Sequence, residues 1–317
     1  MVSELSWGQF WGVLVGGPVF VGLGGLLYWW DQRRRHGLHE RPPQQEKLLR
    51  PAGHSSMVRL DALWDRFLGV TVLGAGAGMI LGIAIPPCAS LLYSLLVGRL
   101  SYAALQASPG YPFVISTYLF TVAALLIFIP QVFRLRSLLK EQRSYRLGLR
   151  GEQAVAEALA SPGVTQPGYV AFHDVPGSGD WNVDHVVVGP GGVFVLETKT
   201  RVRRKSTNGL LDHEVAFDGR TLRFPWGYDS AAVEQVRRNA EWVREFLTGF
   251  GPKDLVIQPV IVVPGWFVRV DGCYPVKVMN ARYLAEAYLP SAVRRFSRDQ
   301  LEAVMRRLDD HCRTVEF

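Results

Sequence analysis

The stretch from Val183 to Thr200 most constrains what this chain can fold into. Two apolar runs meet there at Gly189-Pro190-Gly191-Gly192. The only charges within the stretch are those of Asp184, Glu197 and Lys199. This pattern predicts two buried strands joined by a tight turn. Charged groups inside buried strands cost free energy unless a partner compensates them. The stretch therefore also predicts such a partner, and a bound metal ion would be one.

Glu197 and Lys199 lie on one face of the predicted strand, because side chains two apart share a face. Thr198 points the other way and leaves its carbonyl at the strand edge. If Asp184 lies near Glu197, the two carboxylates and the Thr198 carbonyl form an oxygen-ligand set suited to Mg²⁺ or Mn²⁺. Such a set favours hydrolysis of a phosphodiester, with Lys199 beside the attacking water.

A basic run follows the predicted strand. If the strand persists, Arg201, Arg203 and Lys205 continue the face of Lys199 and would hold a phosphate backbone. A solvated loop or a contact with anionic lipid explains the same run.

The net charge of +7 lies in the first half of the chain. Up to Arg150 there are 15 Lys and Arg residues against 7 Asp and Glu residues, and beyond it 20 against 21. This half also contains three uncharged apolar runs, and about 20 apolar residues suffice to cross a membrane. We expect an anchor over residues 1–145, with spans at about 10–30, 67–85 and 111–133 and a basic loop at 31–66. The second span should end near Pro86-Pro87. The positive charge is thus explained by membrane topology and is not evidence for nucleic acid.

The Lys and Arg residues flanking these runs also predict an orientation. Eight lie between the first two spans, one lies between the second and third, and six follow the third. This asymmetry predicts a multi-pass protein of the plasma (inner) membrane, with its N-terminus outside and its C-terminal domain cytoplasmic. No acid, lysine or histidine lies within the spans, which favours an anchor over a transport path. Small residues recur at four-residue spacing, and they suit packing within the bundle or a homo-oligomer. These residues are Gly8, Gly12, Gly16, Gly74, Gly78 and Gly82.

Residues 146–317 read as a soluble mixed fold. The pattern predicts a helix over 148–160, a strand over 169–175, the hairpin of the opening stretch, a helix over about 230–248 and a strand over 255–263. A strand at 276–279 and helices at 281–289 and from Ser297 onward follow, and we expect 266–317 to pack on a domain of residues 146–265. Three scattered cysteines argue against a disulfide framework.

The chain resembles a known family at four places. These are Leu147-Gly148-Leu149-Arg150-Gly151-Glu152, the run from Val183 to Val188, the run from Gly192 to Lys199, and Gln235. They are similar to the NERD (nuclease-related domain) family of the PD-(D/E)xK superfamily. The resemblance implies an α/β fold with a mixed-sheet, restriction-endonuclease-like core, here joined to a three-helix transmembrane segment. It implies that Asp184 and Glu197 are metal ligands, that Lys199 activates water or stabilises the transition state, and that Glu152 and Gln235 complete the site.

Several of these residues also have a structural interpretation. Glu197 and Lys199 form a simple surface ion pair if the strand is an edge. Glu152 can be a charge stabilised by the start of a helix, and Gln235 a solvated helix residue. His185 fits packing, and Cys312 beside His311 lacks a second pair at zinc-ligand spacing.

Two functions follow from these alternatives. The first is a membrane-tethered, Mg²⁺-dependent nuclease acting on cytoplasmic nucleic acid, with DNA the favoured substrate. The second is a catalytically silent module that binds nucleic acid or a partner at the membrane. It is motivated by Thr200-Arg201-Val202-Arg203, which stands where the family usually has an aromatic residue and a glycine. A third reading, transport or sensing by the spans themselves, rests only on their number.

Overall fold

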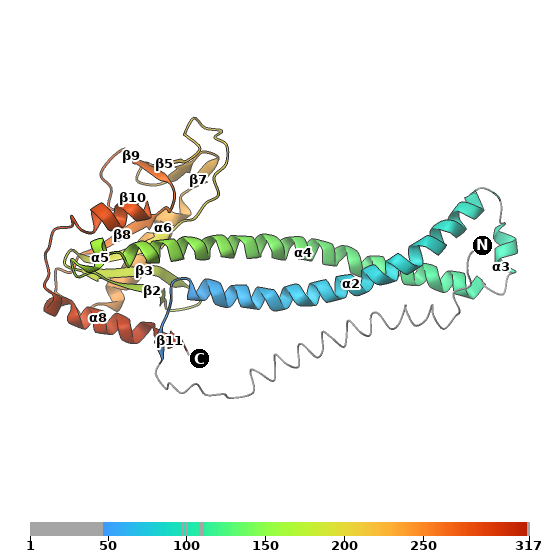
Figure 1. Cartoon of the computed structure of the whole chain (residues 1–317), viewed down its shortest axis with the longest axis horizontal. Helices are drawn as coiled ribbons and strands as arrows, with labels where there is room; N and C mark the ends of the chain where they lie inside the picture. Colours follow the sequence, from blue (N-terminus) through green and yellow to red (C-terminus); the bar gives the residue numbers. More distant parts are fainter. Residues whose placement is uncertain (1–46, 97, 99–100, 108–110, 316–317) are drawn as a thin grey trace. The chain divides into compact units, whose positions relative to one another are not determined.

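The computed structural model describes residues 47–96, 98, 101–107 and 111–315 (Figure 1). They divide into two compact units: a helical unit of residues 61–142, and a domain unit made of residues 47–60 and 143–315. The predicted span at 10–30 and its glycine stripe lie outside the described residues, as does the beginning of the predicted loop at 31–66.

Two long helices run from one unit into the other. Helix α2 spans His54–Leu96 and α4 spans Tyr111–Leu159, with a short α3 at Tyr102–Gln106 between them. Helix α2 contains the predicted span at 67–85, but the prediction that the helix ends near Pro86-Pro87 was wrong, because α2 begins at His54 and continues through both prolines. Its start depends on a distant residue: the Ser55 N–H donates to Asp174 Oδ1 at 3.1 Å, which is a capping contact that local sequence does not reveal.

Helix α4 joins two elements that the sequence analysis separated. The predicted span at 111–133 and the predicted helix at 148–160 are parts of one 49-residue helix, with Pro130 inside it. The basic segment between them contains neither proline nor glycine from 131 to 147 and is rich in good helix formers. Glu152 therefore lies near the C-terminal end of a helix, which removes its interpretation as a charge at a helix start.

Two stretches of these helices are long and apolar enough to cross a membrane, His54–Ala84 and Val114–Leu159. A core helix of a soluble protein can pass the same test of length and composition. Here, only 17% and 11% of the most apolar windows are buried, so the part of the chain that the structure describes leaves most of these surfaces uncovered. The two helices suggest membrane association.

Small residues bring α2 and α4 together within the helical unit. A Cβ atom added at Gly74 would lie 3.6 Å from Gln131 Cβ, and one at Gly78 would lie 3.5 Å from the Phe128 ring. Gly82 has no such neighbour within 4 Å in the described structure. Packing between α2 and α4 thus uses part of the predicted stripe.

A five-stranded mixed sheet forms the centre of the domain unit. Its strands are β2 (Val170–Pro176), β3 (Asn182–Gly189), β4 (Gly192–Thr198), β8 (Ile257–Val262) and β10 (Lys277–Met279), in the order β10-β8-β4-β3-β2. Strands β2, β3 and β4 are antiparallel, whereas β8 runs parallel to β4 and β10. The predicted strands and the β3–β4 hairpin are confirmed, and the hairpin closes through Pro190 and Gly191.

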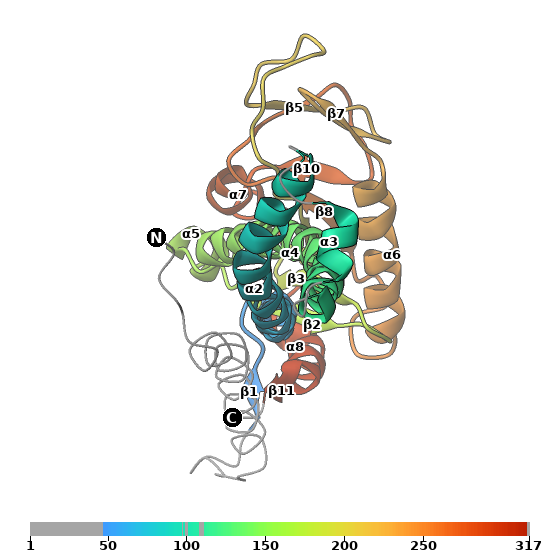
Figure 2. The same cartoon turned by 90° about the vertical axis from the view of Figure 1, so that its right-hand side faces the viewer.

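Helices cover both faces of this sheet (Figure 2). Helices α6 (Ala231–Phe246) and α8 (Arg298–Cys312) pack on one face. The end of α4, the short α5 (Pro162–Thr165) and the π-helical turn η1 (Leu284–Tyr288) pack on the other, and α7 (Ala281–Tyr283) leads into η1. The helices predicted at 230–248, at 281–289 and after Ser297 are confirmed, including the capping box of Ser297 and Gln300.

A second sheet was not predicted from the sequence. It consists of β5 (Glu214–Phe217), β6 (Leu222–Phe224), β7 (Gly227–Asp229) and β9 (Phe267–Val270), in the order β7-β6-β5-β9. Strands of three or four residues are too short to show a clear alternation of apolar and polar residues. A further pair, β1 (Leu48–Leu49) and β11 (Arg313–Val315), joins segments from opposite ends of the described chain.

Candidate functional site

The β3–β4 hairpin brings the two predicted acids to the same end of the sheet. His185 pairs with Leu196 across the hairpin, and Asp184 and Glu197 are the next residues on their strands. Opposed residues of antiparallel strands share a face of the sheet. Contact across the strands is direct, because the Thr198 N–H donates to Asp184 Oδ2 at 2.7 Å. The hairpin register thus places Asp184 beside the end of β4, as the sequence analysis expected.

Lys199 follows the last residue of β4, and its hydrogen-bonding partners lie on β4, on α6 and on β8. Its Nζ donates to Glu197 Oε1 at 2.6 Å and to Gln235 Oε1 at 3.0 Å, and its backbone N–H donates to Val262 O at 2.9 Å. Glu197 is only 2% exposed, and its second oxygen, Oε2, accepts from Asn239 Nδ2 at 3.2 Å. The pair is therefore not a surface ion pair on an edge strand, because β4 lies between β3 and β8.

Helix α6 supplies the amides of this cluster from its inner face. Gln235 and Asn239 lie one helical turn apart, so both side chains can reach β4. The helix begins where Asp229 Oδ1 accepts from the Ala232 N–H at 3.1 Å. Asn239 was missed by the sequence analysis. Its signal was its spacing of four from Gln235 and its place beside the apolar residues Val236 and Ala240 of the same helix. A buried asparagine at such a place needs a hydrogen-bonding partner.

Glu152 reaches the site from α4 because Gly151 allows a very close approach. A Cβ atom added at Gly151 would lie 1.7 Å from Thr200 Oγ1, just after Lys199. The Glu152 side chain is buried; Ser56 Oγ donates to its Oε1 at 3.2 Å, whereas its Oε2 has no hydrogen-bonding partner among the described residues. Glu152 is thus a buried acid with one oxygen left unsatisfied near the other acids.

Burial, together with neighbouring acids, makes the three carboxyl groups harder to ionise. Burial raises the pKa of Glu152 to about 7, and the charges of Asp174 and Glu197 add to the shift. Burial, followed by repulsion from Glu197 and Glu152, raises the pKa of Asp184 well above its usual range. Burial also raises the pKa of Glu197, against the lowering effect of Lys199. The single ammonium of Lys199 therefore does not offset the cluster of carboxyl groups.

This donor set fits a hard cation such as Mg²⁺. An unsatisfied buried carboxyl oxygen and mutually repelling acids are what a cation would stabilise. Within the described residues, no group of three or more His, Cys, Asp or Glu side chains is arranged to hold a metal ion. Mg²⁺ usually keeps several waters and takes one or two protein carboxylates, so Asp184 and Glu197 with the Thr198 carbonyl remain a suitable set.

A cavity of about 330 Å³ lies beside Lys199. Its lining includes Arg201, Arg204, Trp226 and, from α4, Gly148. The volume lies in the lower range of small-ligand pockets. Lys199 and the neighbouring Thr198 line this cavity, and two guanidinium groups lie beside them.

The predicted basic face differs from the one observed. Strand β4 ends at Thr198, so the alternation expected for Arg201, Arg203 and Lys205 does not continue. Arg201 pairs with Asp229 at 2.5 Å, and Arg203 donates to the Gly265 carbonyl, away from the cavity lining. Arg204, which strict alternation places on the opposite face, lines the cavity instead and lies 5.9 Å from the Trp226 ring centre.

His185, His311 and Cys312 behave as packing and hydrogen-bonding residues. His185 is buried, and its Nδ1 lies 2.8 Å from His173 Nδ1. His311 Nε2 lies 2.8 Å from the Pro176 carbonyl, and Cys312 is buried in the core formed with α8. These contacts agree with the structural interpretation of both positions.

The close approach at Gly151 makes a direct prediction. We expect Gly151→Ala to lower the free energy of unfolding by about 1–3 kcal/mol through overpacking against Thr200. Gly148→Ala is the matched control on the same helix, because an added Cβ there meets nothing within 4 Å. It should be neutral or stabilising by up to about 1 kcal/mol. Chemical denaturation of both variants measures the difference, and equal stabilities would contradict the packing described here.

Part of the chain is similar to a known protein family. Residues 147–264 match the family model of NERD, described as the nuclease-related domain. The match begins within α4, ends just after β8 and includes Glu152, Asp184, Glu197 and Lys199. No curated protein and no solved structure matches the chain.

Proposed function

We propose, from the membership of residues 147–264 in the nuclease-related domain family, that this protein is a membrane-anchored, metal-dependent nuclease. The observation that carries the proposal is the position of Lys199, whose Nζ bonds both Glu197 and Gln235 beside Asp184. A lysine fixed next to two acids at the end of a central strand is the arrangement that phosphodiester hydrolysis needs. The mixed sheet with helices on both faces supports a restriction-endonuclease-like core.

Each residue of the cluster has a role in this proposal. Asp184, Glu197 and the Thr198 carbonyl would hold Mg²⁺ or Mn²⁺, which supplies charge neutralisation and an acidified water when bound. The Lys199 ammonium is fixed by Glu197 and Gln235, so it can orient the attacking water or stabilise charge on a phosphoryl oxygen. Glu152 adds a buried acid with one unsatisfied oxygen.

The cavity beside Lys199 is the proposed entry for nucleic acid. Arg201 and Arg204 line it, and guanidinium groups bind phosphates well. Arg203 and Lys205 lie on the same exposed segment and extend the positive charge. We take DNA as the favoured substrate.

The proposed location is the plasma (inner) membrane, with the domain on the cytoplasmic side. The two apolar helices support membrane association, and the distribution of Lys and Arg residues supports this orientation. The protein would contact the lipid bilayer through these helices. Their small residues also leave room for a homo-oligomer.

Removal of the metal is the first test of this function. Full-length protein in detergent should cleave DNA with Mg²⁺ or Mn²⁺, lose cleavage with excess EDTA and recover it when Mg²⁺ is restored in excess. Cleavage of labelled single-stranded and double-stranded DNA and RNA, followed on gels, identifies the substrate. Cleavage that persists at full rate in EDTA, or no cleavage under any of these conditions, would contradict the proposal.

A silent binding module is the second candidate. It is favoured by the contacts of Arg201 with Asp229 and of Arg203 with the Gly265 carbonyl, which give both side chains a structural role within the domain. Mg²⁺ titration separates the two functions. Saturable binding that depends on Asp184 supports the nuclease, whereas nucleic-acid binding without metal binding supports the module.

A further inference from the structure

The segment from residue 47 to residue 60 belongs to the domain unit, although residues 61–142 separate it from the rest of that unit in sequence. Strand β1 pairs with β11, where Leu48 lies opposite Val315. The Arg50 N–H donates to the Cys312 carbonyl at 3.1 Å. This segment, called here the leading segment, lies outside the region that matches the family.

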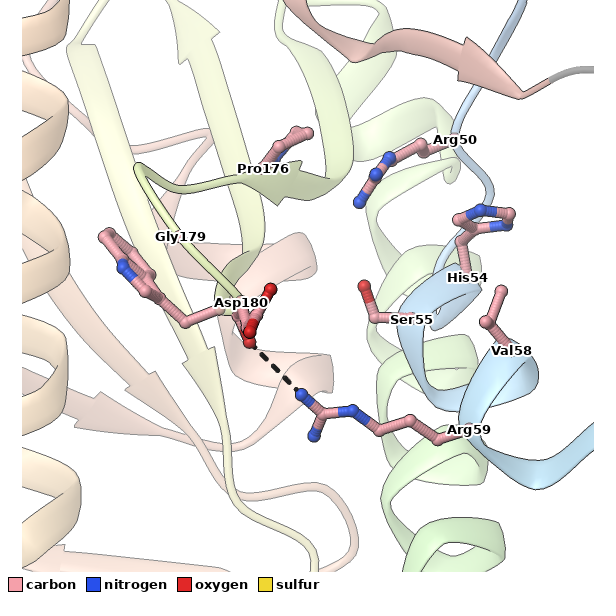
Figure 3. Close-up of a pocket in the computed structure, with 9 residues that line it drawn as sticks. Arg50, His54, Ser55, Val58, Arg59, Pro176, Gly179 and Asp180 are labelled. Carbon is pink, nitrogen blue, oxygen red and sulfur yellow. Dashed lines mark hydrogen bonds between the residues drawn. The ribbon is translucent and has the colours of Figure 1, made fainter. Parts of the chain in front are cut away.

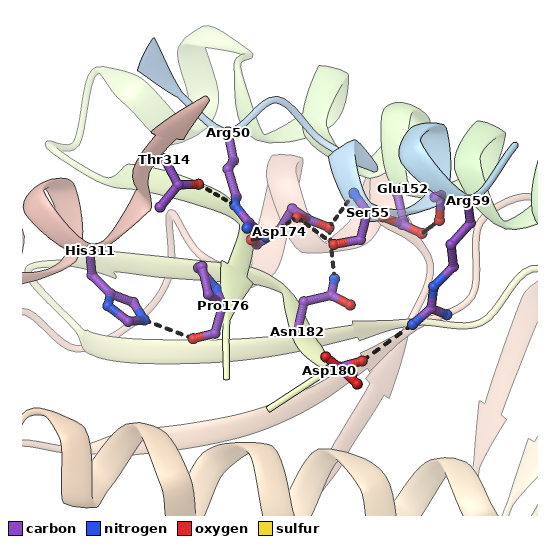
Figure 4. A network of polar contacts seen from close by, with 11 residues as sticks. Arg50, Ser55, Arg59, Glu152, Asp174, Pro176, Asp180, Asn182, His311 and Thr314 are labelled. Carbon is purple, nitrogen blue, oxygen red and sulfur yellow. Dashed lines mark hydrogen bonds and ion pairs between the residues drawn. The ribbon is translucent and has the colours of Figure 1, made fainter. Parts of the chain in front are cut away.

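Asp174 ties the leading segment to the central sheet (Figure 4). Its carboxylate is 0% exposed and accepts from Arg50 Nη1 at 2.8 Å, from the Ser55 N–H at 3.1 Å and from Ser55 Oγ at 2.8 Å. A fourth bond comes from Asn182 Nδ2 at 2.9 Å, two residues before Asp184. Three of the four bonds thus come from the leading segment, and a buried carboxylate without them would be strongly unfavourable.

Elsewhere the leading segment is separated from the sheet by a cavity of about 560 Å³ (Figure 3). Arg50, Ser55 and Arg59 point across this space toward Pro176 and Asp180. Arg59 Nη2 donates to the Asp180 carbonyl at 3.2 Å. The position of the segment on this side therefore depends on a few polar contacts, of which those to Asp174 are the most buried.

The same segment places Ser56 against Glu152. Gly53 has φ of 75°, and a Cβ added there would lie 2.2 Å from Leu149 Cδ1, so the turn before α2 lies directly on α4. Within the first turn of α2, Ser56 Oγ donates to Glu152 Oε1 at 3.2 Å. This bond fixes one carboxyl oxygen of Glu152, while Oε2 has no partner in the described structure. Figure 4 shows Glu152 in the same polar network as Ser55 and Asp174.

We propose that Ser56 is a positioning residue of the nuclease site, supplied by α2 from outside the family match. The inference rests on the proposed function. Ser56 holds the Glu152 carboxyl group in one rotation, and the second oxygen, Oε2, lies at the Gly53 turn, 3.5 Å from a Cβ added there. Outer hydrogen bonds of this kind commonly orient groups around a metal. The site is therefore complete only when the first turn of the apolar helix α2 is docked on the domain.

Mg²⁺ binding and cleavage by the full-length protein in detergent test this role. We expect Ser56→Ala to weaken Mg²⁺ binding in calorimetry and to lower kcat, each by about 10-fold to 100-fold, with little change in KM for DNA. Ser56→Thr keeps the hydroxyl and should restore most of both. Thermal unfolding should show that Ser56→Ala folds, with a Tm within about 4 °C of the wild type.

Thr71→Ala is the matched control. It removes a hydroxyl from the same helix, where Thr71 Oγ1 bonds only the Phe67 and Leu68 carbonyls of its own helix at 2.9 Å each. It should leave Mg²⁺ affinity and kcat unchanged. If the wild type binds Mg²⁺ and cleaves but Ser56→Ala equals it, the role of Ser56 is overturned and the nuclease function stands. If the wild type neither binds Mg²⁺ nor cleaves, the function itself fails and the role of Ser56 fails with it.

Discussion

Replacement of Glu197 by glutamine should abolish saturable Mg²⁺ binding and lower DNA cleavage by about 10²–10³-fold. The change keeps the size of the side chain and removes its charge. Glu197 is buried between β3 and β8, so no neighbouring acid can move into its place without rearranging the central sheet. The loss should therefore appear in both metal affinity and kcat, measured by calorimetry and by gel-based cleavage assays on the full-length protein.

Glu214→Gln is the matched control for this experiment. Glu214 is also a buried glutamate, 6% exposed, and it pairs with Arg269 at 3.0 Å on the second sheet. Its replacement should leave Mg²⁺ binding and cleavage close to wild type. If Glu197→Gln and Glu214→Gln behave alike, Glu197 is a structural acid and the proposed metal site is wrong.

Lys199→Met should separate metal binding from chemistry. The variant removes the only ammonium that bonds Glu197, so the remaining acids should attract a divalent cation at least as strongly as before. Cleavage should nevertheless fall by about 10²-fold or more, because the group that orients water or stabilises phosphoryl charge is lost. Calorimetry with Mg²⁺ and single-turnover cleavage measure the two effects on one protein sample.

The control for Lys199→Met is Lys253→Met, which removes an ammonium from an exposed position between α6 and β8. It should change neither quantity. Full cleavage by Lys199→Met would contradict the assigned role of Lys199. Loss of Mg²⁺ binding together with cleavage would show instead that Lys199 is needed to keep Glu197 in place.

Local patterning was enough to predict the central hairpin. The two apolar runs required buried strands, and Gly192 adopts φ of 120° at the turn, a conformation that glycine tolerates best. The antiparallel register then placed Asp184 and Glu197 on adjoining strands without further information. Apolar periodicity also predicted α6 and α8, because each helix has one face buried in the same core.

The helix boundaries show where local patterning failed. Pro86-Pro87 indicated a helix end, and the pattern separated the apolar run at 111–133 from the helix at 148–160, yet both helices continue. A proline stops a helix only when its lost hydrogen bond is not compensated, and apolar helices often tolerate it. The beginning of α2 depends instead on Asp174, which lies in a distant part of the chain.

The sequence by itself determined the hairpin that carries Asp184, Glu197 and Lys199, since two continuous apolar runs meet there at a turn of glycine and proline. Only the tertiary structure decided the rest. Glu152, Gln235 and Asn239 arrive on two helices whose rotation depends on packing against the sheet, including the contact at Gly151. Ser56 lies 96 residues before Glu152, on a helix start that is capped by Asp174, and no local pattern encodes this cap. Strand alternation is a local property, whereas the meeting of separate elements depends on the whole core.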